Sequence, residues 1–329
     1  MKFRRILAAV LSCALVATSV MAVTGCNKSE GSEEPKEKTY TVGICQLVQH
    51  PALDAATEGF KKALTEKLGD KVKFDEQNAS GDSATCTTIV NQFVAANVDL
   101  IMANATPAVQ AAVAGTADIP ILGTSVTEYG VALGIDNFSG KTGINVSGTS
   151  DLAPLDKQAA MFAELLPEAK KVGILYCSNE ANSKYQAEVV SKELTNAGIE
   201  VVEYTFADSN DIAQVVEKAC EEIDALYIPT DNQCANNAEL INNIASEKSK
   251  PIIAGEEGIC KGCGIATLSI SYDNIGYATG LMAYEILVNG QDPAEMEIQY
   301  DDAPVYKYMA DRCAAFNVTV PENYVAIEG

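Results

Sequence analysis

The chain has 329 residues, with 23 Lys and Arg against 45 Asp and Glu and a formal net charge of −22. This acidity argues against nucleic-acid binding, which needs basic surface to neutralise phosphates, and it keeps an exported protein soluble. The length is that of a two-domain protein, large enough to build a core without disulfide staples.

The amino terminus has the layout of a secretory signal peptide, with a basic start at residues 1–5 and an apolar run at 6–23. A membrane helix is the alternative, because the run is just long enough to span a bilayer. The run ends in Val-Thr-Gly-Cys, which resembles the lipobox of bacterial lipoproteins. The resemblance implies removal of residues 1–25 and a lipid on Cys26, and several acyl chains hold a soluble domain firmly at a membrane. Residues 26–38 then form a charged, lipidated flexible tether without periodicity.

From Thr39 onward, strand and helix patterns alternate. The first half reads as strands at 39–48, 71–79, 99–105 and 119–126, with helices at 51–69, 83–98 and 106–117. A glycine-rich stretch at 127–154 holds one obvious strand at 142–148. The alternation then restarts with helices at 155–169, 182–198, 211–223 and 236–249, and strands at 170–178, 199–207, 224–231 and 250–258. This pattern predicts an α/β protein with parallel, doubly wound sheets.

The two halves match each other in order. YTVGICQ parallels KKVGILYC, VDLIMANAT parallels IDALYIPTD, and DIPILGTS parallels SKPIIAGEE. We therefore expect two similar lobes, the first built from 39–146 and 273–298, and the second from 147–272 and 299–329. Three connecting strands form the hinge, and ligands are expected in the cleft at the carboxyl ends of the strands.

Catalytic and metal motifs are missing from the sequence. It contains no nucleophile elbow and no phosphate-binding glycine loop, and its one histidine, His50, lacks an identifiable nucleophile to activate. We predict a protein that is not an enzyme and that carries no cofactor.

Eight cysteines remain after Cys13 in the leader and Cys26, and most are expected to be free thiols in apolar elements. They are Cys45, Cys86, Cys177, Cys220, Cys234, Cys260, Cys263 and Cys313. Only Cys260 and Cys263 have a metal-like spacing. No second pair matches it, so a local disulfide or buried thiols are favoured over zinc.

Several fragments together resemble the substrate-binding lipoproteins of ABC transporters, in the family that includes tryptophan- and other aromatic-amino-acid-binding proteins. They are QHPALDAATEGFKKAL, NQFVAANVDLIMANATPAVQAA, IPILGTSVTE, NVSGTSD, ALYIPTDNQ and ATLSISYDNIGYATGLMAYEIL, and the resemblance covers about residues 39–325. It implies two Rossmann-like lobes of the type I periplasmic-binding-protein fold, a ligand trapped by hinge closure, and delivery to a membrane permease driven by a separate ATPase. The expected protein is a monomer, lipid-anchored on the outer side of the cell membrane. The extra acid in GEEG and the cysteines depart from the family pattern.

Residues at the predicted strand ends are candidates for binding an amino-acid zwitterion, both of whose charges need partners once water is lost. Thr106 opens a helix, where free N–H groups and the helix dipole favour a carboxylate, although it also suits a plain helix cap. Thr124 and Ser125 follow the fourth strand and complete the carboxylate site. Leu47, His50 and Leu53 are expected to floor a pocket for a large side chain.

Acidic residues in the second lobe are candidates for the ligand ammonium. Asp231 is the first choice, Glu256 the second, and Asp273 at the hinge the third, with a solvated surface acid as the alternative for each. Asn182 and Ser183, which open a helix, are expected to hydrogen-bond the ligand across the cleft.

Two other functions fit the same two-lobed pattern. One is a ligand sensor for a membrane receptor. The other is a binder of a sugar or nucleoside, although sugar sites usually stack aromatic rings and the predicted loops offer few.

Overall fold

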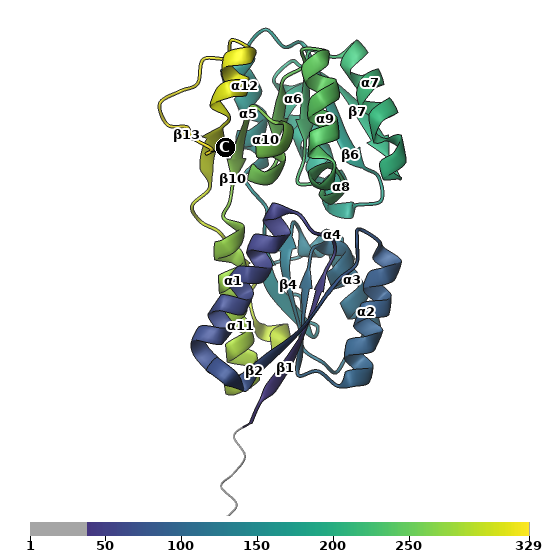
Figure 1. The fold of residues 1–329 in the computed structure, drawn as a ribbon, viewed down its shortest axis with the longest axis vertical. Helices are drawn as coiled ribbons and strands as arrows, with labels where there is room; N and C mark the ends of the chain where they lie inside the picture. Colours follow the sequence, from purple (N-terminus) through teal and green to yellow (C-terminus); the bar gives the residue numbers. More distant parts are fainter. Residues whose placement is uncertain (1–37, 329) are drawn as a thin grey trace, which may run out of the picture. The chain divides into compact units, whose positions relative to one another are not determined.

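The computed structural model describes residues 38–328, which fold around two separate sheets (Figure 1). The predicted leader, Cys26 and the tether as far as Glu37 lie outside the described residues. Within residues 38–328, none of the helices combines the length and apolar character that a membrane crossing requires.

The first sheet has the strand order β11-β5-β4-β3-β1-β2, and all its neighbouring strands are parallel. Its strands are β1 (Tyr40–Gln46), β2 (Val72–Asn78), β3 (Leu100–Asn104), β4 (Ile121–Val126), β5 (Val146–Ser150) and β11 (Gln299–Tyr300). The helices of this lobe are α1 (Pro51–Leu68), α2 (Ser83–Ala96), α3 (Thr106–Gly115), α4 (Tyr129–Leu133) and α11 (Tyr272–Asn289), with short 3₁₀ turns η1 (Gly69–Lys71) and η3 (Pro293–Glu295).

The second sheet has the order β13-β12-β10-β9-β8-β6-β7, and only β12 runs antiparallel to its neighbour β10. Its strands are β6 (Lys171–Cys177), β7 (Glu200–Phe206), β8 (Ala225–Ile228), β9 (Ile252–Ala254), β10 (Ala266–Ser269), β12 (Val305–Tyr308) and β13 (Val325–Ala326). Its helices are α5 (Leu155–Leu165), α6 (Ala181–Asn196), α7 (Ile212–Glu222), α8 (Asn232–Asn236), α9 (Ala238–Glu247), α10 (Glu257–Cys263) and α12 (Ala310–Ala315), with η2 (Ser209–Asp211).

The expected similarity of the two lobes is confirmed by their topology. The order β2-β1-β3-β4-β5 in the first sheet repeats as β7-β6-β8-β9-β10 in the second, and the matched sequences occupy equivalent strands. Gly43 and Gly173 occupy equivalent positions of β1 and β6, and at both an aromatic ring leaves little room for a side chain. A β-carbon on Gly43 would lie 2.6 Å from the ring of Phe93, and one on Gly173 would lie 3.0 Å from Tyr204.

The chain crosses between the lobes three times, as expected, at residues 151–154, 270–271 and 301–304. The expected boundaries at 146/147 and 298/299 differ from the structure, because β5 pairs with β4, and β11 pairs with β5, in the first sheet. The reason is that β5 is buried but polar: Ser147, Thr149 and Ser150 are all inaccessible. A strand of this kind lacks the apolar run that marks its neighbours.

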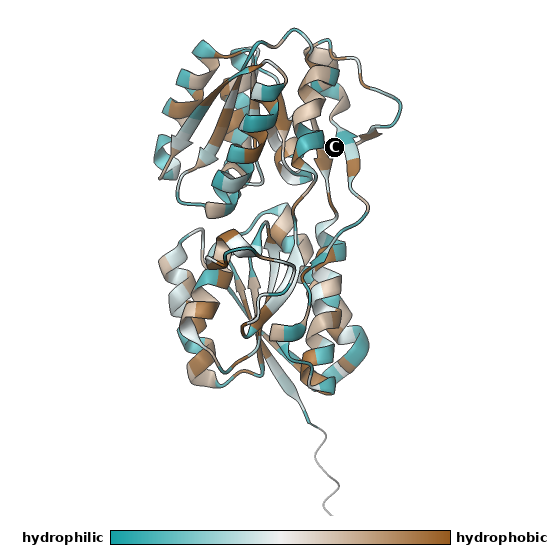
Figure 2. Ribbon diagram, turned by 180° about the vertical axis from the view of Figure 1, so that it is seen from behind, coloured by the Kyte–Doolittle hydropathy of each residue, from teal (hydrophilic) through white to brown (hydrophobic). Residues whose placement is uncertain are grey.

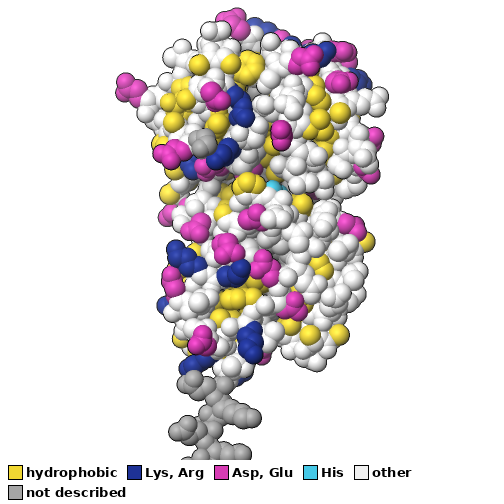
Figure 3. All heavy atoms as spheres, viewed as in Figure 1, with side chains coloured by type: hydrophobic (Ala, Val, Ile, Leu, Met, Phe, Trp, Pro, Cys, Tyr) yellow, Lys and Arg dark blue, Asp and Glu magenta, His cyan; other side chains and the backbone are white. Residues whose placement is uncertain are grey.

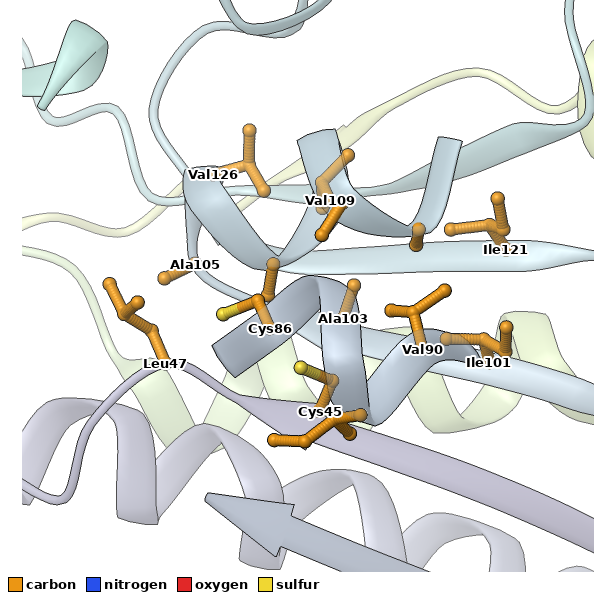
Figure 4. Packing of buried hydrophobic residues seen from close by; sticks show 14 of the residues in the cluster. Cys45, Leu47, Cys86, Val90, Ile101, Ala103, Ala105, Val109, Ile121 and Val126 are labelled. Carbon is orange, nitrogen blue, oxygen red and sulfur yellow. The ribbon is translucent and has the colours of Figure 1, made fainter. Parts of the chain in front are cut away.

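Hydrophobic residues of the central strands are buried, and many residues on the helices are hydrophilic (Figure 2). Acidic side chains are spread over the visible face (Figure 3), as the net charge requires. All eight cysteines of the described residues are buried free thiols. Cys45 on β1 and Cys86 on α2 face each other within the first-lobe core (Figure 4), and Cys260 and Cys263 pack in the second-lobe core. These thiols serve as small apolar side chains.

Candidate ligand-binding site between the lobes

A small, narrow cavity lies where the carboxyl ends of the two sheets face each other, and we call it the inner cavity. It is lined by His50, Leu53, Ser125, Asp151, Asn182, Thr230, Asp231, Asn232, Ala235, Glu256, Ile259 and Tyr272. A wider hollow, the outer pocket, opens beside it between the same lobes, and its lining includes Leu47, Gly81, Glu180 and Gln233. Neither lining contains a lysine or arginine.

Unsatisfied polar atoms concentrate in the inner cavity. Among the described residues, six buried side-chain N or O atoms have no hydrogen-bond partner, and four of the six belong to residues that line this cavity. They are His50 Nδ1, Ser125 Oγ, Asp151 Oδ1 and Asn182 Oδ1. An unpaired buried polar atom costs about 1–3 kcal/mol, so a cluster of four marks a place where another molecule supplies the partners.

His50 is held by a contact that crosses the cleft. Its Nε2 lies 3.2 Å from Oδ1 of Asn232, and the Asn232 side-chain NH₂ donates to Glu180 at 2.7 Å. The Asn232 oxygen must therefore accept, so His50 donates through Nε2 and leaves Nδ1 as a bare acceptor. Burial lowers the pKa of His50, which favours this neutral form.

Asp151 follows β5 on the first crossing segment and is 4% exposed. The hydroxyl of Tyr272 donates to its Oδ2 at 3.0 Å, while Oδ1 is unpaired. Burial raises the pKa of Asp151, so a cation beside it would be favourable. Asp151, His50 and Asn182 together present three acceptor atoms to the cavity.

Ser125 reaches the cavity because β4 is irregular there. The register with β5 shifts between Gly123 and Val126, and Ser125 has φ 54°. This left-handed conformation is uncommon for a residue other than glycine and is typically retained at functional sites. Its unpaired hydroxyl is the one group of the four that is able to donate.

The two leading acid candidates are already occupied by backbone groups. Asp231 caps α8, accepting from Cys234 N at 2.8 Å, and its other oxygen accepts from Cys177 N at 2.7 Å. Glu256 caps α10 and accepts from Gly258 N at 2.5 Å and from Ile259 N. Burial raises the pKa of both acids, that of Glu256 to about 7. Both line the cavity, but as helix caps.

The structure brings His50, Leu53, Ser125, Asn182, Asp231 and Glu256 together, as expected. Leu47 lines the outer pocket instead. Four other candidates are not part of the inner lining. Thr106 is buried at the start of α3, and the hydroxyl of Thr124 contacts that of Thr149 at 3.1 Å. Ser183 is buried beside Asp231, and Asp273 is exposed in the first turn of α11.

Several lining residues were not anticipated. Asp151 is the most important, and it would have been found had β5 been assigned whole to the first sheet, since the residue directly follows that strand. Tyr272 precedes the predicted Asp273 by one position, and its side chain turns inward where that of Asp273 stays in solvent. The remaining ones are Thr230, Asn232, Ala235 and Ile259.

The fold and the inter-lobe cavity agree with comparisons to known proteins. The family model described as ABC transporter substrate binding protein matches residues 41–326. The chain belongs to this family, whose members are extracytoplasmic binding proteins for small molecules rather than enzymes.

Individual relatives are similar over most of their length. A tyrosine-binding protein of Clostridioides difficile (strain R20291) is 38% identical over 296 residues, which cover 87% of this chain and 85% of the relative. A Streptococcus pneumonia protein solved in complex with L-Trp is 29% identical, with a TM-score of 0.84 over 88% of this chain and 100% of that one. The ligand-free, open structure of a Clostridium difficile substrate binding protein with adhesive properties is 37% identical, with a TM-score of 0.67 over 88% and 99%.

Proposed function

We propose that this protein captures an aromatic L-amino acid in the inner cavity and delivers it to an ABC permease. The observation that carries the proposal is the set of three unpaired acceptors, Asp151 Oδ1, His50 Nδ1 and Asn182 Oδ1, in a cavity whose lining contains no lysine or arginine. An ammonium group has three donors and one positive charge, so it satisfies these acceptors and offsets the buried negative charge.

The other ends of the ligand have partners in the same lining. The Ser125 hydroxyl is assigned to the ligand carboxylate. Leu53, Ala235 and Ile259, together with the ring of Tyr272, supply apolar surface for its side chain. Thr106 and Thr124 are buried outside this lining, and we assign them a supporting role for Ser125.

Two comparisons support an aromatic ligand bound by lobe closure. The relatives named above include a tyrosine-binding protein and one solved with L-Trp. The TM-score is higher for the L-Trp complex than for the open, ligand-free structure, although the latter is more similar in sequence. Hydrogen bonds that cross the cleft agree with a closed arrangement.

Titration calorimetry with a panel of analogues tests the proposal. L-tyrosine, L-tryptophan and L-phenylalanine are expected to bind, whereas 3-(4-hydroxyphenyl)propionate, which lacks the ammonium, should lose more affinity than tyramine, which lacks the carboxylate. Binding of a sugar or nucleoside in place of all three amino acids would overturn the assignment.

We also propose that Cys26 carries the lipid anchor and that the mature protein is a monomer. Expression in a bacterial host should place the protein in the detergent phase of a Triton X-114 partition, and Cys26→Ser should move it to the aqueous phase. A wild-type protein that stays aqueous after export would contradict the anchor.

A further inference from the structure

The start of α8 separates the inner cavity from the outer pocket and contacts the opposite lobe twice. Asn232 Oδ1 lies 3.2 Å from His50 Nε2, and Gln233 Nε2 donates to the carbonyl oxygen of Gly81 at 3.3 Å. Asn232 faces the inner cavity, and Gln233 the outer pocket. The conformation of these two residues therefore decides whether their side-chain amides present an oxygen or an NH₂ group to the first lobe.

Glu180 holds both of them from behind. Its Oε2 accepts from the Asn232 side chain at 2.7 Å, from Asn232 N at 3.1 Å and from the Asn182 side chain at 3.2 Å, and its Oε1 accepts from Gln233 N at 3.1 Å. Glu180 is 4% exposed and none of the contacts just named is with a cation. Burial, and then the charge of Asp231, raise the pKa of Glu180 to about 8. Burying an acid without a cationic partner costs folding free energy, which is expected where the residue serves the function of the protein.

We infer that Glu180 is a positioning residue, which sets the tautomer of His50 through Asn232. Because Glu180 takes the Asn232 NH₂, the Asn232 oxygen is turned to the cleft, and His50 must donate to it through Nε2. His50 Nδ1 is then free to accept from the ligand. Glu180 Oε2 accepts from Asn232 whether the carboxyl is ionised or protonated. In the protonated form the proton is carried by Oε1, which has a free lone pair for it.

We call the chain of contacts from Glu180 through Asn232 to His50 the relay. It rests on the proposed function in one respect, namely that the ligand group that donates to His50 Nδ1 is an ammonium. Without Glu180, the Asn232 amide is free to rotate and offer its NH₂ to His50. His50 would then accept at Nε2 and carry its proton on Nδ1, where it opposes an ammonium group. Glu180 also accepts from the side-chain NH₂ of Asn182, whose oxygen is another acceptor in the cavity.

The single histidine of the chain makes the tautomer measurable. In ¹⁵N-labelled, tag-free protein saturated with L-tyrosine, the long-range ¹H–¹⁵N spectrum of His50 is expected to show Nε2–H. Glu180→Leu should shift the population toward Nδ1–H and weaken L-tyrosine binding roughly tenfold, the scale of one hydrogen bond to a charged group. Glu180→Gln keeps a side-chain oxygen for Asn232 and should restore both properties in large part.

Two further variants complete the experiment. Glu203→Gln alters another second-lobe acid, which accepts from Tyr176 at 2.7 Å away from the cleft, and should change neither the tautomer nor the affinity. Asn232→Ala removes the acceptor for His50 Nε2–H, so it should reduce the preference for the Nε2–H form and weaken L-tyrosine binding, which keeps the inference testable if Glu180→Leu fails to fold.

The outcomes separate this inference from the proposed function. Wild-type His50 in the Nδ1–H form, or a folded Glu180→Leu protein with unchanged tautomer and affinity, would overturn the relay. Wild-type protein that binds no aromatic amino acid would overturn the proposed function. The spectrum of the unliganded protein would then decide the relay, with Nδ1–H contradicting it.

Discussion

Gly276 of α11 lies so close to α1 that a β-carbon at this position would be 2.0 Å from the carbonyl oxygen of Ala56. Gly280, one turn further on, would meet Ala63 at 2.6 Å, and Gly59 of α1 would meet the Asp273 carbonyl at 2.3 Å. Small residues on both helices thus allow their backbones to approach closely. Since α11 begins directly after the second crossing segment, this contact fixes the position at which that segment joins the first lobe.

Replacing Gly276 with alanine should therefore destabilise the protein, because a backbone carbonyl cannot move aside as a flexible side chain can. The expected loss is at least about 2 kcal/mol of unfolding free energy, measured by urea denaturation. Asn274→Ala, at an exposed position of the same helix, should stay within about 0.5 kcal/mol of wild type. Equal effects of the two substitutions would contradict the close helix contact.

Asp151→Asn should weaken binding of L-tyrosine by roughly 100-fold, because it removes the charge opposite the ligand ammonium. Asp231→Asn should instead lower unfolding stability by about 1 kcal/mol, since both Asp231 oxygens accept from backbone N–H groups. Calorimetry and thermal unfolding on both variants check this ranking. A greater loss of affinity in Asp231→Asn would restore Asp231 as the ammonium partner, the role that its position after β8 suggests.

Stability of the unliganded protein should fall as the pH rises from 6.5 to 8.5. Burial raises the pKa of Glu256 to about 7 and that of Glu180 to about 8, so in this range the folded state binds more protons than the unfolded state, and stability decreases with pH. The lowered pKa of His50 acts in the opposite direction, but only below its ordinary value of about 6.5.

Urea denaturation at a series of pH values measures this effect, with an expected total loss on the order of 1 kcal/mol or more. Glu256→Gln should flatten the lower part of the profile. Stability that is constant or rises over this range would show that the two carboxyls are not buried in the folded state.

Arg312 caps the carboxyl end of α10, and its replacement should loosen that helix. Its Nη1 donates to Cys260 O at 2.9 Å and Gly264 O at 3.0 Å, and its Nη2 donates to Lys261 O and Gly262 O, both at 2.9 Å. Arg312→Ala should cost about 2 kcal/mol, and Arg312→Lys should recover little, because lysine lacks the planar fork of donors.

Thiol reactivity provides a second measurement for α10. Cys260 and Cys263 are buried in this helix and should react faster with Ellman's reagent in Arg312→Ala than in wild type. Lys307→Ala, which breaks only the ion pair with Glu257, is the matched control and should change stability by about 0–1 kcal/mol. Unchanged labelling in Arg312→Ala would show that the cap does not hold α10.

The order of strands and helices, the duplication and the three crossings follow from the sequence by itself, because they depend on local periodicity and on turn residues. The same holds for the positions of Ser125, Asn182 and Glu256 near the cleft, since strand ends meet at one edge of a parallel sheet. β5 was the exception, because its buried side chains are small and polar, and Asp151 was missed with it.

Only the tertiary structure decided which polar groups are left for a ligand. Whether an acid is free or serves as a helix cap depends on which backbone N–H groups surround it, and Asp231 and Asp151 cannot be told apart on this point by composition or spacing. The acceptor on His50 depends on Asn232, a residue 182 positions away. Contacts of this kind arise when the lobes meet, so they are recorded in the packing of the folded chain rather than in any local pattern.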